Sequence, residues 1–252
     1  MQIVSYNVNG IRSAIGKGLL TWMEQRKADV YCFQETKAHS NQVDTSLFEL
    51  FGYNHYWFSA QKKGYSGVAI FSKHKPDHVE FGFGDKKFDE EGRIIRADFG
   101  DTSIISVYIP SGTSGEERQA FKMKWLDFFN EYIDTLKTKK SNLIICGDYN
   151  ICHQPIDIHD PVGNKNSSGF LPEERQWLSG FLESGFVDSF RRFHPEPHQY
   201  SWWTFRHNAR AQNKGWRIDY CLVHEKITER LLDSGIHQDI VHSDHCPVWV
   251  EI

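Results

Sequence analysis

Polar side chains of the kinds that perform catalysis follow short apolar runs at many places in this sequence. Near the C-terminus, Ser243, Asp244 and His245 precede the alternating apolar run 248–252. A single Asp or Asn after a strand is most simply a turn residue, because its side chain hydrogen-bonds nearby backbone. A large set of such groups favours an active site, because α/β folds assemble their sites at strand ends. The whole set is Asn7, Asn9, Glu35, Tyr108, Asp148, Asn150, Asp219, Asp244 and His245.

The residue types in this set favour one kind of chemistry. Glu35 and Asp244, with an amide oxygen from Asn7 or Asn9, are hard oxygen ligands that suit Mg²⁺ or Mn²⁺ and suit zinc poorly. The sequence has no HExxH, CxxC, GxxxxGK[ST] or GxSxG motif, so zinc hydrolysis, nucleotide binding through a phosphate loop and acyl transfer have little support. A metal beside a carboxylate and an imidazole fits phosphodiester hydrolysis, in which the carboxylate activates water and the imidazole donates to the phosphate.

The elements that must position these residues are predicted from periodicity. Apolar, β-branched and aromatic runs predict strands at 3–6, 30–33, 55–58, 68–71, 94–99, 104–109, 143–146, 219–223 and 248–252. Helical spacing predicts helices at 19–26, 45–51, 116–136, 172–183 and 227–233, the last ended by Gly235. Some strands follow one another with no helix between them. This favours an α/β sandwich of mixed sheets over a strictly alternating barrel.

Two of the predicted strands resemble each other. IVSYNVN and LIICGDYN are each an apolar strand that ends in two polar residues one position apart. In an extended chain these polar side chains point to the same side. The two segments could therefore deliver two polar pairs to one cleft, although chance alone could produce the similarity.

Composition and charge narrow the class of protein. Of 252 residues, 39% are apolar and 25% charged, which is typical of a folded globular chain and argues against disorder. A net charge of −4 does not indicate nucleic-acid binding for the chain as a whole, but it permits a local basic face. Five cysteines, odd in number and without metal-type spacing, predict reduced thiols and a cytoplasmic location. With no signal-peptide pattern or apolar run long enough to span a bilayer, we expect a soluble protein without a membrane partner.

Eight segments of the chain together resemble a known family. In order they are SYNVNGIR, FQETK, GYSGVAIFS, VYIPSG, ICGDYNICH, GNKNSSGFLPEER, GWRIDY and SDHCPV. SDH alone is weakly specific, but QET, GDxN, GFxPxER and SDHxP in series are strongly specific. The set resembles the exonuclease III class of AP endonucleases in the endonuclease/exonuclease/phosphatase superfamily. The resemblance covers nearly the whole chain and implies one domain over residues 1–252. That domain would be a DNase I-like four-layer α/β sandwich, with two mixed sheets face to face, helices outside and a cleft at one edge of both sheets.

The resemblance also implies a role for each residue of the catalytic set. Glu35 would be the main metal ligand, helped by Asn7 and Asp244, with Mg²⁺ as the implied cofactor and Mn²⁺ as the alternative. Asp148 would activate the attacking water, and Asn150 would position it.

The remaining members of the set would hold the scissile phosphate. His245 would bind it, and Asp219 would fix the tautomer of His245 and raise its pKa through its negative charge. Tyr108 and Asn164 would contact the same phosphate.

The resemblance further implies a pocket for a base-free deoxyribose and a surface for the DNA backbone. The pocket would be lined by Trp202, Trp216 and Ile218, and an abasic sugar costs less to extrude from the duplex than a paired base. Basic and aromatic groups near the cleft could offset the acidic chain locally. These candidates for DNA contact are Lys37, Tyr65, Lys62, Lys63, Arg206, His207, Arg210 and Lys214.

The sequence departs from the family pattern in two places. Asn9 stands where part of the family has an acid, which removes one negative charge from the metal site and should weaken metal affinity. Ser111 stands where an amide is usual, and Thr113 and Ser114 are small in a loop where some relatives insert a bulky residue into DNA. This loop therefore lacks the bulky side chain that those relatives insert into the duplex.

The function expected from these observations is a metal-dependent DNA repair nuclease. It would act as a monomer on double-stranded DNA with abasic sites or 3′ ends, cutting 5′ to the abasic site in base excision repair. It would also have 3′-to-5′ exonuclease and 3′-end cleaning activity. One alternative is a phosphodiesterase or phosphatase for a small or lipid substrate. A second is a DNA-damage reader with an inactive site, which the complete catalytic set opposes.

Overall fold

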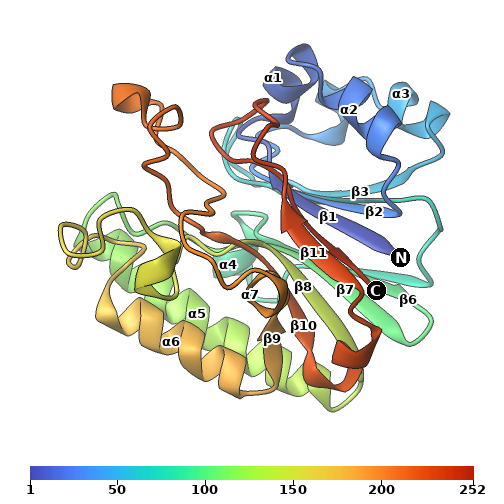
Figure 1. Cartoon of the computed structure of the whole chain (residues 1–252). Coiled ribbons are helices and arrows are strands. Elements are labelled where there is room, and N and C mark those ends of the chain that lie inside the picture. The colour runs from blue at the N-terminus through green and yellow to red at the C-terminus, as the bar shows by residue number, and fades with distance from the viewer.

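The computed structural model describes residues 1–252 and contains two six-stranded mixed sheets packed face to face (Figure 1). The first sheet has the strand order β11-β12-β1-β2-β4-β3. Its strands are β1 (Gln2–Asn7), β2 (Val30–Gln34), β3 (Asn54–Phe58), β4 (Val68–Ser72), β11 (Asp233–Ile236) and β12 (Val248–Glu251). The second has the order β5-β6-β7-β8-β10-β9. Its strands are β5 (His78–Phe81), β6 (Ile94–Phe99), β7 (Thr102–Tyr108), β8 (Asn142–Asp148), β9 (Phe186–Asp188) and β10 (Asp219–His224).

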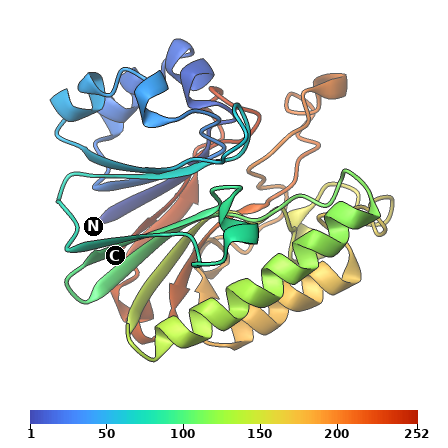
Figure 2. The same cartoon turned by 180° about the vertical axis from the view of Figure 1, so that it is seen from behind.

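Helices cover the outer face of each sheet, which completes four layers (Figures 1 and 2). The first sheet is covered by α1 (Ile11–Gly16), α2 (Leu19–Arg26) and α3 (Ser46–Leu50). The second is covered by α5 (Glu116–Lys137) and α6 (Pro172–Glu183), with α4 (Lys86–Asp89) and α7 (Ser189–Phe193) at its margins. No helix is both long enough and apolar enough to cross a bilayer. The two mixed sheets with helices on their outer faces confirm the predicted four-layer α/β sandwich.

Apolar side chains fill all three interfaces between the layers. Between the sheets, Ile3, Ile70 and Val250 of the first sheet belong to the same buried cluster as Ile104 and Ile144 of the second. Strands at the centre read as continuous apolar runs because both of their faces are covered. Apolar residues at helical spacing on α5 face the second sheet, with Trp125, Phe129 and Ile133 fully or almost fully buried.

The two similar segments of the sequence become β1 and β8, which occupy equivalent places in the two sheets. Each pairs in parallel with one neighbour, β2 or β7, and antiparallel with the other, β12 or β10. Polar groups at the ends of the two strands do meet, because Nδ2 of Asn7 at the end of β1 donates to Asp148 at the end of β8. Asn7 is buried, however, and of the two expected polar pairs only Asp148 and Asn150 line the cleft.

The helix predicted at 227–233 is wrong. The chain forms a 3₁₀ turn at Glu225–Arg230 and then enters β11, so Gly235 lies in a strand and does not end a helix. A Cβ atom at Gly235 would lie only 2.8 Å from Nε1 of Trp249 in β12. The lack of a side chain at Gly235 therefore allows the Trp249 ring to pack against β11. Strands β5, β9 and β11 were not predicted, because each is a short edge strand with few apolar residues.

Candidate active site

The topology brings the polar strand ends to one edge of both sheets. Because β1 and β2 are parallel, Asn7 and Glu35 emerge on the same side, and the parallel pair β7 and β8 does the same for Tyr108 and Asp148. Strand β10 runs antiparallel to β8, so its first residue, Asp219, pairs directly with Asp148. Strand β12 likewise runs antiparallel to β1, so the segment just before it, which holds Asp244 and His245, reaches the same edge.

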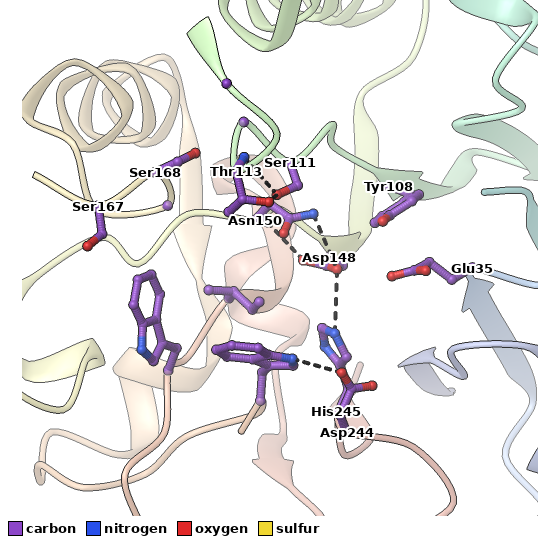
Figure 3. A pocket seen from close by; sticks show the side chains of 16 residues that line it. Glu35, Tyr108, Ser111, Thr113, Asp148, Asn150, Ser167, Ser168, Asp244 and His245 are labelled. Atoms are coloured by element: carbon purple, nitrogen blue, oxygen red, sulfur yellow. Dashed lines mark hydrogen bonds and ion pairs between the residues drawn. The ribbon is translucent and has the colours of Figure 1, made fainter. Parts of the chain in front are cut away.

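Asp219 and His245 form a buried pair at this edge. Nδ1 of His245 donates to Oδ2 of Asp219 at 2.9 Å, which leaves Nε2 directed toward Asp148 at 3.8 Å from Oδ2 (Figure 3). Burial acts to lower the pKa of His245, but the negative charges of Asp219 and Asp148 outweigh burial and raise it. The imidazole is therefore held as a cation with one N–H free for a ligand.

Asp148 lies at the centre of the cluster and is 1% exposed. The backbone N–H of Asn150 donates to Oδ1 at 2.8 Å, and Nδ2 of Asn7 donates to Oδ2 at 2.8 Å. Burial raises the pKa of Asp148 despite the opposing charge of His245. A carboxylate whose pKa is moved toward neutrality is suited to accept a proton during catalysis.

Glu35 supplies a second carboxylate beside Asp148. Ligand atoms of Glu35, Asp148 and His245 all lie within 4.8 Å of one another. Burial acts to raise the pKa of Glu35. The charge of Lys37, whose Nζ lies 2.7 Å from Oε2, together with the hydrogen bond from Asn7 and the charge of His245, outweighs burial and lowers the pKa. Glu35 is therefore ionised at neutral pH. Two carboxylates this close together fit a divalent cation that binds through oxygen.

Asp244 supplies the third carboxylate. Oδ1 accepts from Nδ2 of Asn9 at 2.8 Å, and Oδ2 accepts from Nε1 of Trp202 at 3.1 Å. Burial acts to raise the pKa of Asp244, but the positive charge of His245 and these hydrogen bonds outweigh it and lower the pKa. Trp202 therefore lines the cleft and also orients a candidate metal ligand.

The amide oxygens of Asn7 and Asn9 do not point at the carboxylate cluster. Oδ1 of Asn7 accepts from the backbone N–H of Asn9, and Oδ1 of Asn9 accepts from Nζ of Lys37. Their Nδ2 atoms face Glu35, Asp148 and Asp244 instead. Both amides would have to exchange these hydrogen bonds to bind a metal, so their role as ligands stays a prediction.

The cleft in front of this cluster has a volume of about 620 Å³ (Figure 3). One wall carries Trp202, Trp216 and Ile218. The two indole rings meet edge to face, with 5.9 Å between their ring centres. The other wall is made of small residues, which are Ser111, Gly112, Thr113, Gly115, Ser167, Ser168 and Gly169. The cleft thus combines an apolar wall, a hydroxyl-lined wall and a charged floor.

Tyr108 lines the cleft, whereas Tyr65 does not. The guanidinium of Arg93 stacks 4.5 Å from the ring centre of Tyr108 and donates to the hydroxyl of Tyr65 at 3.0 Å. Burial, with the nearby charge of Glu35, raises the pKa of Tyr108 well above its ordinary value. Its hydroxyl is therefore a neutral donor.

Two other candidates also lie outside the walls of this cleft. The amide of Asn164 donates to the carbonyls of His159 and Asp160, at 3.3 and 2.9 Å, and stabilises its own loop. Lys37 borders a separate polar groove.

Among the basic candidates for DNA contact, the side chain of Arg210 is already engaged in contacts within the protein. Its guanidinium donates to the carbonyls of Gln238, Ile240 and Ser243 and stacks on Trp203. Lys62, Lys63, Arg206, His207 and Lys214 are exposed. Arg206 and His207 lie on an arm that stands apart from the sheets, drawn in orange in Figure 1.

Several site residues have an unusual backbone. Asn9, Glu35, Lys37 and Asn150 all have φ between 45° and 50°, the left-handed region that residues with a side chain seldom adopt. They lie one to three residues after the ends of β1, β2 and β8. Strain of this kind is typical of functional sites, where the surrounding structure holds it in place.

Ser201 is a site residue that sequence reasoning missed. Its buried hydroxyl donates to Oδ2 of Asp219 at 2.6 Å and accepts from the backbone N–H groups of Ile218 and Asp219. It thereby fixes the carboxylate that holds His245. The sequence carried no signal for it, because a serine in a loop has no distinctive neighbours.

Three features together define a class of phosphoester hydrolases: the two-sheet sandwich, the polar strand ends at one edge, and the buried pair of Asp219 and His245. The sequence profile described as the Endonuclease/Exonuclease/phosphatase family matches residues 4–245, and the chain belongs to this family. The family expected from the sequence motifs is confirmed.

Similar proteins place the chain within one branch of the family. It is 44% identical over 250 residues to an exodeoxyribonuclease of Bacillus subtilis, covering 98% of each chain. It is 39% identical over 251 residues to the DNA repair nuclease APEX1 of Danio rerio, covering 98% of this chain and 81% of that protein. Its fold matches an AP endonuclease from Archaeoglobus fulgidus with a TM-score of 0.90 and 32% identity, over 99% of this chain and 98% of the other.

Proposed function

We propose that this chain is a metal-dependent DNA repair nuclease that cuts the backbone 5′ to an abasic site and also shortens and cleans 3′ ends. The observation that carries the proposal is the meeting of Glu35, Asp148 and His245 in one cleft beside the wall of Trp202 and Trp216. The names of similar proteins, which include exodeoxyribonucleases and AP endonucleases, support the same activity.

In this proposal the reaction is hydrolysis of one phosphodiester bond. Asp148 takes a proton from water as the water oxygen attacks phosphorus, and the bond from phosphorus to the upstream 3′ oxygen breaks. That oxygen leaves and takes up a proton, giving a 3′-hydroxyl on one side and a 5′-phosphate on the abasic sugar. Asn150 and Asn7 hold the Asp148 carboxylate in orientation, as their 2.8 Å hydrogen bonds support.

Several groups would stabilise the negative charge of the scissile phosphate. Protonated His245 donates from Nε2 to a non-bridging oxygen, and its orientation is fixed by Asp219. Tyr108 donates from its neutral hydroxyl. Glu35, whose carboxylate lies near Asp148, would be the main ligand of a divalent cation, Mg²⁺ in this proposal, and Asp244 of the same cleft would assist it. When bound, the cation would offset charge on the phosphate and the leaving oxygen.

The substrate in this proposal is double-stranded DNA. Trp202, Trp216 and Ile218 would pack against the abasic sugar, because a sugar without a base presents an apolar ring face. The exposed basic side chains of Arg206 and His207 would contact the DNA backbone, because such groups bind phosphate oxygens. One chain supplies every residue of the cleft, which supports a monomer, and five free buried cysteines support a reducing, cytoplasmic location.

The experiment that tests the proposal uses a duplex with one abasic-site analogue and a labelled 5′ end. With purified protein and Mg²⁺ we expect a single cut 5′ to the lesion, abolished by EDTA and restored by excess Mg²⁺. Undamaged duplex is the control for 3′ shortening. Intact abasic DNA with shortened 3′ ends would remove the sugar pocket from the proposal. No cleavage of DNA, together with hydrolysis of a lipid or inositol phosphate, would establish a phosphatase for small substrates instead.

A further inference from the structure

A lysine and a glutamate lie fully buried behind the wall of the cleft. Lys122 of α5 and Glu174 of α6 are both 0% exposed, and Nζ of Lys122 lies 2.6 Å from Oε1 of Glu174. A buried ion pair of this kind seldom stabilises a fold more than apolar residues of the same size would. Stability therefore gives little reason for charged residues at this place.

The pair binds the backbone of two loops at the cleft, the loop that holds Asn150 and the 167–171 loop. Lys122 donates from Nζ to the carbonyl oxygen of Asn150 at 2.8 Å. Oε2 of Glu174 accepts from the backbone N–H groups of Gly169 and Leu171, at 2.6 and 3.0 Å. Two helices on the outside of the second sheet thus hold the backbone at two points of the cleft.

Gln119, one turn before Lys122 on α5, adds a further hydrogen bond to the 167–171 loop and packs against the loop 111–115. Its Nε2 donates to Oε1 of Glu174 at 3.0 Å, and its Oε1 accepts from the hydroxyl of Ser168 at 2.8 Å. A Cβ atom at Gly112 would collide with the Gln119 side chain, so the glycine lets the loop 111–115 pack directly on the network.

The backbone held by this network carries catalytic geometry. Asn150 has φ 50°, and its N–H is one of the two donors at 2.8 Å from the Asp148 carboxylate. Gly169 has φ 95°, and a Cβ there would lie 3.0 Å from the ring of Trp216 and 3.2 Å from the carbonyl of Asn150. A shift of Asn150 or Gly169 would therefore displace both the residue that accepts the proton and the apolar wall.

We infer that Lys122 and Glu174 are positioning residues, which hold Asn150 and the 167–171 loop so that Asp148 and Trp216 meet the substrate in productive geometry. The inference rests on the proposed function, because it concerns the rate of the same cleavage. Neither side chain lines the cleft, so the pair acts only through the backbone that it binds.

The test is Lys122→Met, which keeps the length of the side chain and removes its charge and donors. We expect kcat and kcat/KM for the abasic duplex to fall together by about 100-fold, the cost of roughly 1 Å of misplacement at a reacting group. Lys122→Arg, which restores charge and donors, should recover much of the rate. A KM that rises while kcat stays unchanged would contradict a positioning role in the chemical step.

A second variant separates positioning from folding. Lys122→Met with Glu174→Gln removes both charges but keeps an acceptor for Gly169 and Leu171, so its melting temperature should recover relative to Lys122→Met alone. Its rate should stay low, because the Asn150 carbonyl still lacks its donor. A rate that recovers in step with stability would overturn the inference and leave the pair a purely structural role.

Two comparisons complete the design. Asp98→Asn breaks another buried ion pair, with Arg96 on the far part of the second sheet, and should lower stability without changing kcat. The wild-type protein is assayed on the same duplex. If the wild type does not cut, the proposed function fails; if it cuts and Lys122→Met cuts equally fast, only the positioning role fails.

Discussion

Burial and charge act against each other at the side chain of Asp148. The carboxylate is almost inaccessible, which favours its neutral form, while His245 and two hydrogen-bond donors favour the ionised form. Asp219 on the other side of His245 adds negative charge and holds the imidazole as a cation. The contacts among these three groups raise the pKa of both Asp148 and His245. Asp148 is therefore a stronger base than an aspartate in water, and His245 stays protonated at neutral pH.

Asp148→Asn tests this arrangement at the level of one functional group. The amide occupies the same volume but cannot accept a proton, so we expect single-turnover cleavage of abasic DNA to fall by about 10⁴-fold, the upper end for loss of a general base. Binding of the same duplex, measured by fluorescence anisotropy, should stay nearly unchanged. Asp127→Asn on the exposed face of α5 is the matched control. Turnover at the wild-type rate would remove Asp148 from the mechanism.

At the scale of elements, one buried carboxylate joins the loop after β8 to the segment that forms the pocket wall. Asp157 accepts from Nε of Arg217 at 2.8 Å and from Nη2 of Arg191, in α7, at 2.6 Å. Arg217 stands between Trp216 and Ile218 in the chain, and its Nη2 also donates to Asp188 at 2.7 Å. These ion pairs hold Arg217 in place and thereby position its two neighbours in the pocket wall, Trp216 and Ile218.

Asp157→Asn should destabilise the protein in a pH-dependent way. Burial acts to raise the pKa of Asp157, but Arg217 and Arg191 outweigh it and lower the pKa to about 2. A carboxyl whose pKa is lower in the folded state stabilises the fold above its ordinary pKa of about 3.9 and loses that effect as pH falls toward 2. We expect a loss of about 3 kcal/mol at pH 7, measured by urea unfolding.

The difference between the wild type and Asp157→Asn should persist at pH 5 and shrink between about pH 4 and pH 2. Asp127→Asn, measured over the same range, should show no such trend, since Asp127 is exposed on α5. A difference that stays constant down to pH 3 or grows with acidity would show that the charge of Asp157 does not stabilise the fold.

At the scale of the whole molecule, the two sheets share one apolar interior. Residues of β1, β2, β4 and β12 pack in the same cluster as residues of β6, β7, β8 and β10. Separating the sheets would expose both inner faces to water, at a cost of about 25 cal/mol for each Å² of apolar surface. We therefore propose that residues 1–252 form one domain that unfolds as a unit.

Urea unfolding followed by far-ultraviolet circular dichroism and by tryptophan fluorescence should give one transition with coincident midpoints. Hydrogen exchange sharpens this test, because amides in β2 and in β8 should reach the same maximal protection. Two separated transitions, or a sheet that exchanges freely while the other stays protected, would show two independently folding halves.

Local patterns in the sequence determined the central strands, the long helices and the types of catalytic residue. Helix α6 and helix α2 begin and end at the predicted residues, because helical periodicity and terminal signals are local properties. The edge strands β5, β9 and β11 escaped prediction, since pairing with a neighbouring strand, and not their own composition, makes them strands.

Which polar groups lie in contact, and which of them are ionised, depends on the tertiary structure. The sequence placed Asn7, Asp148 and Asp219 at strand ends, but the mutual distances depend on strand order and direction in two sheets. Nor could it show that Asn164 bonds its own loop or that Ser201 holds Asp219, because a hydrogen bond depends on distance and angle between segments far apart in the chain. Residue type limits the chemistry available, whereas burial and neighbouring charge, which exist only in the folded chain, set the pKa values that make it usable.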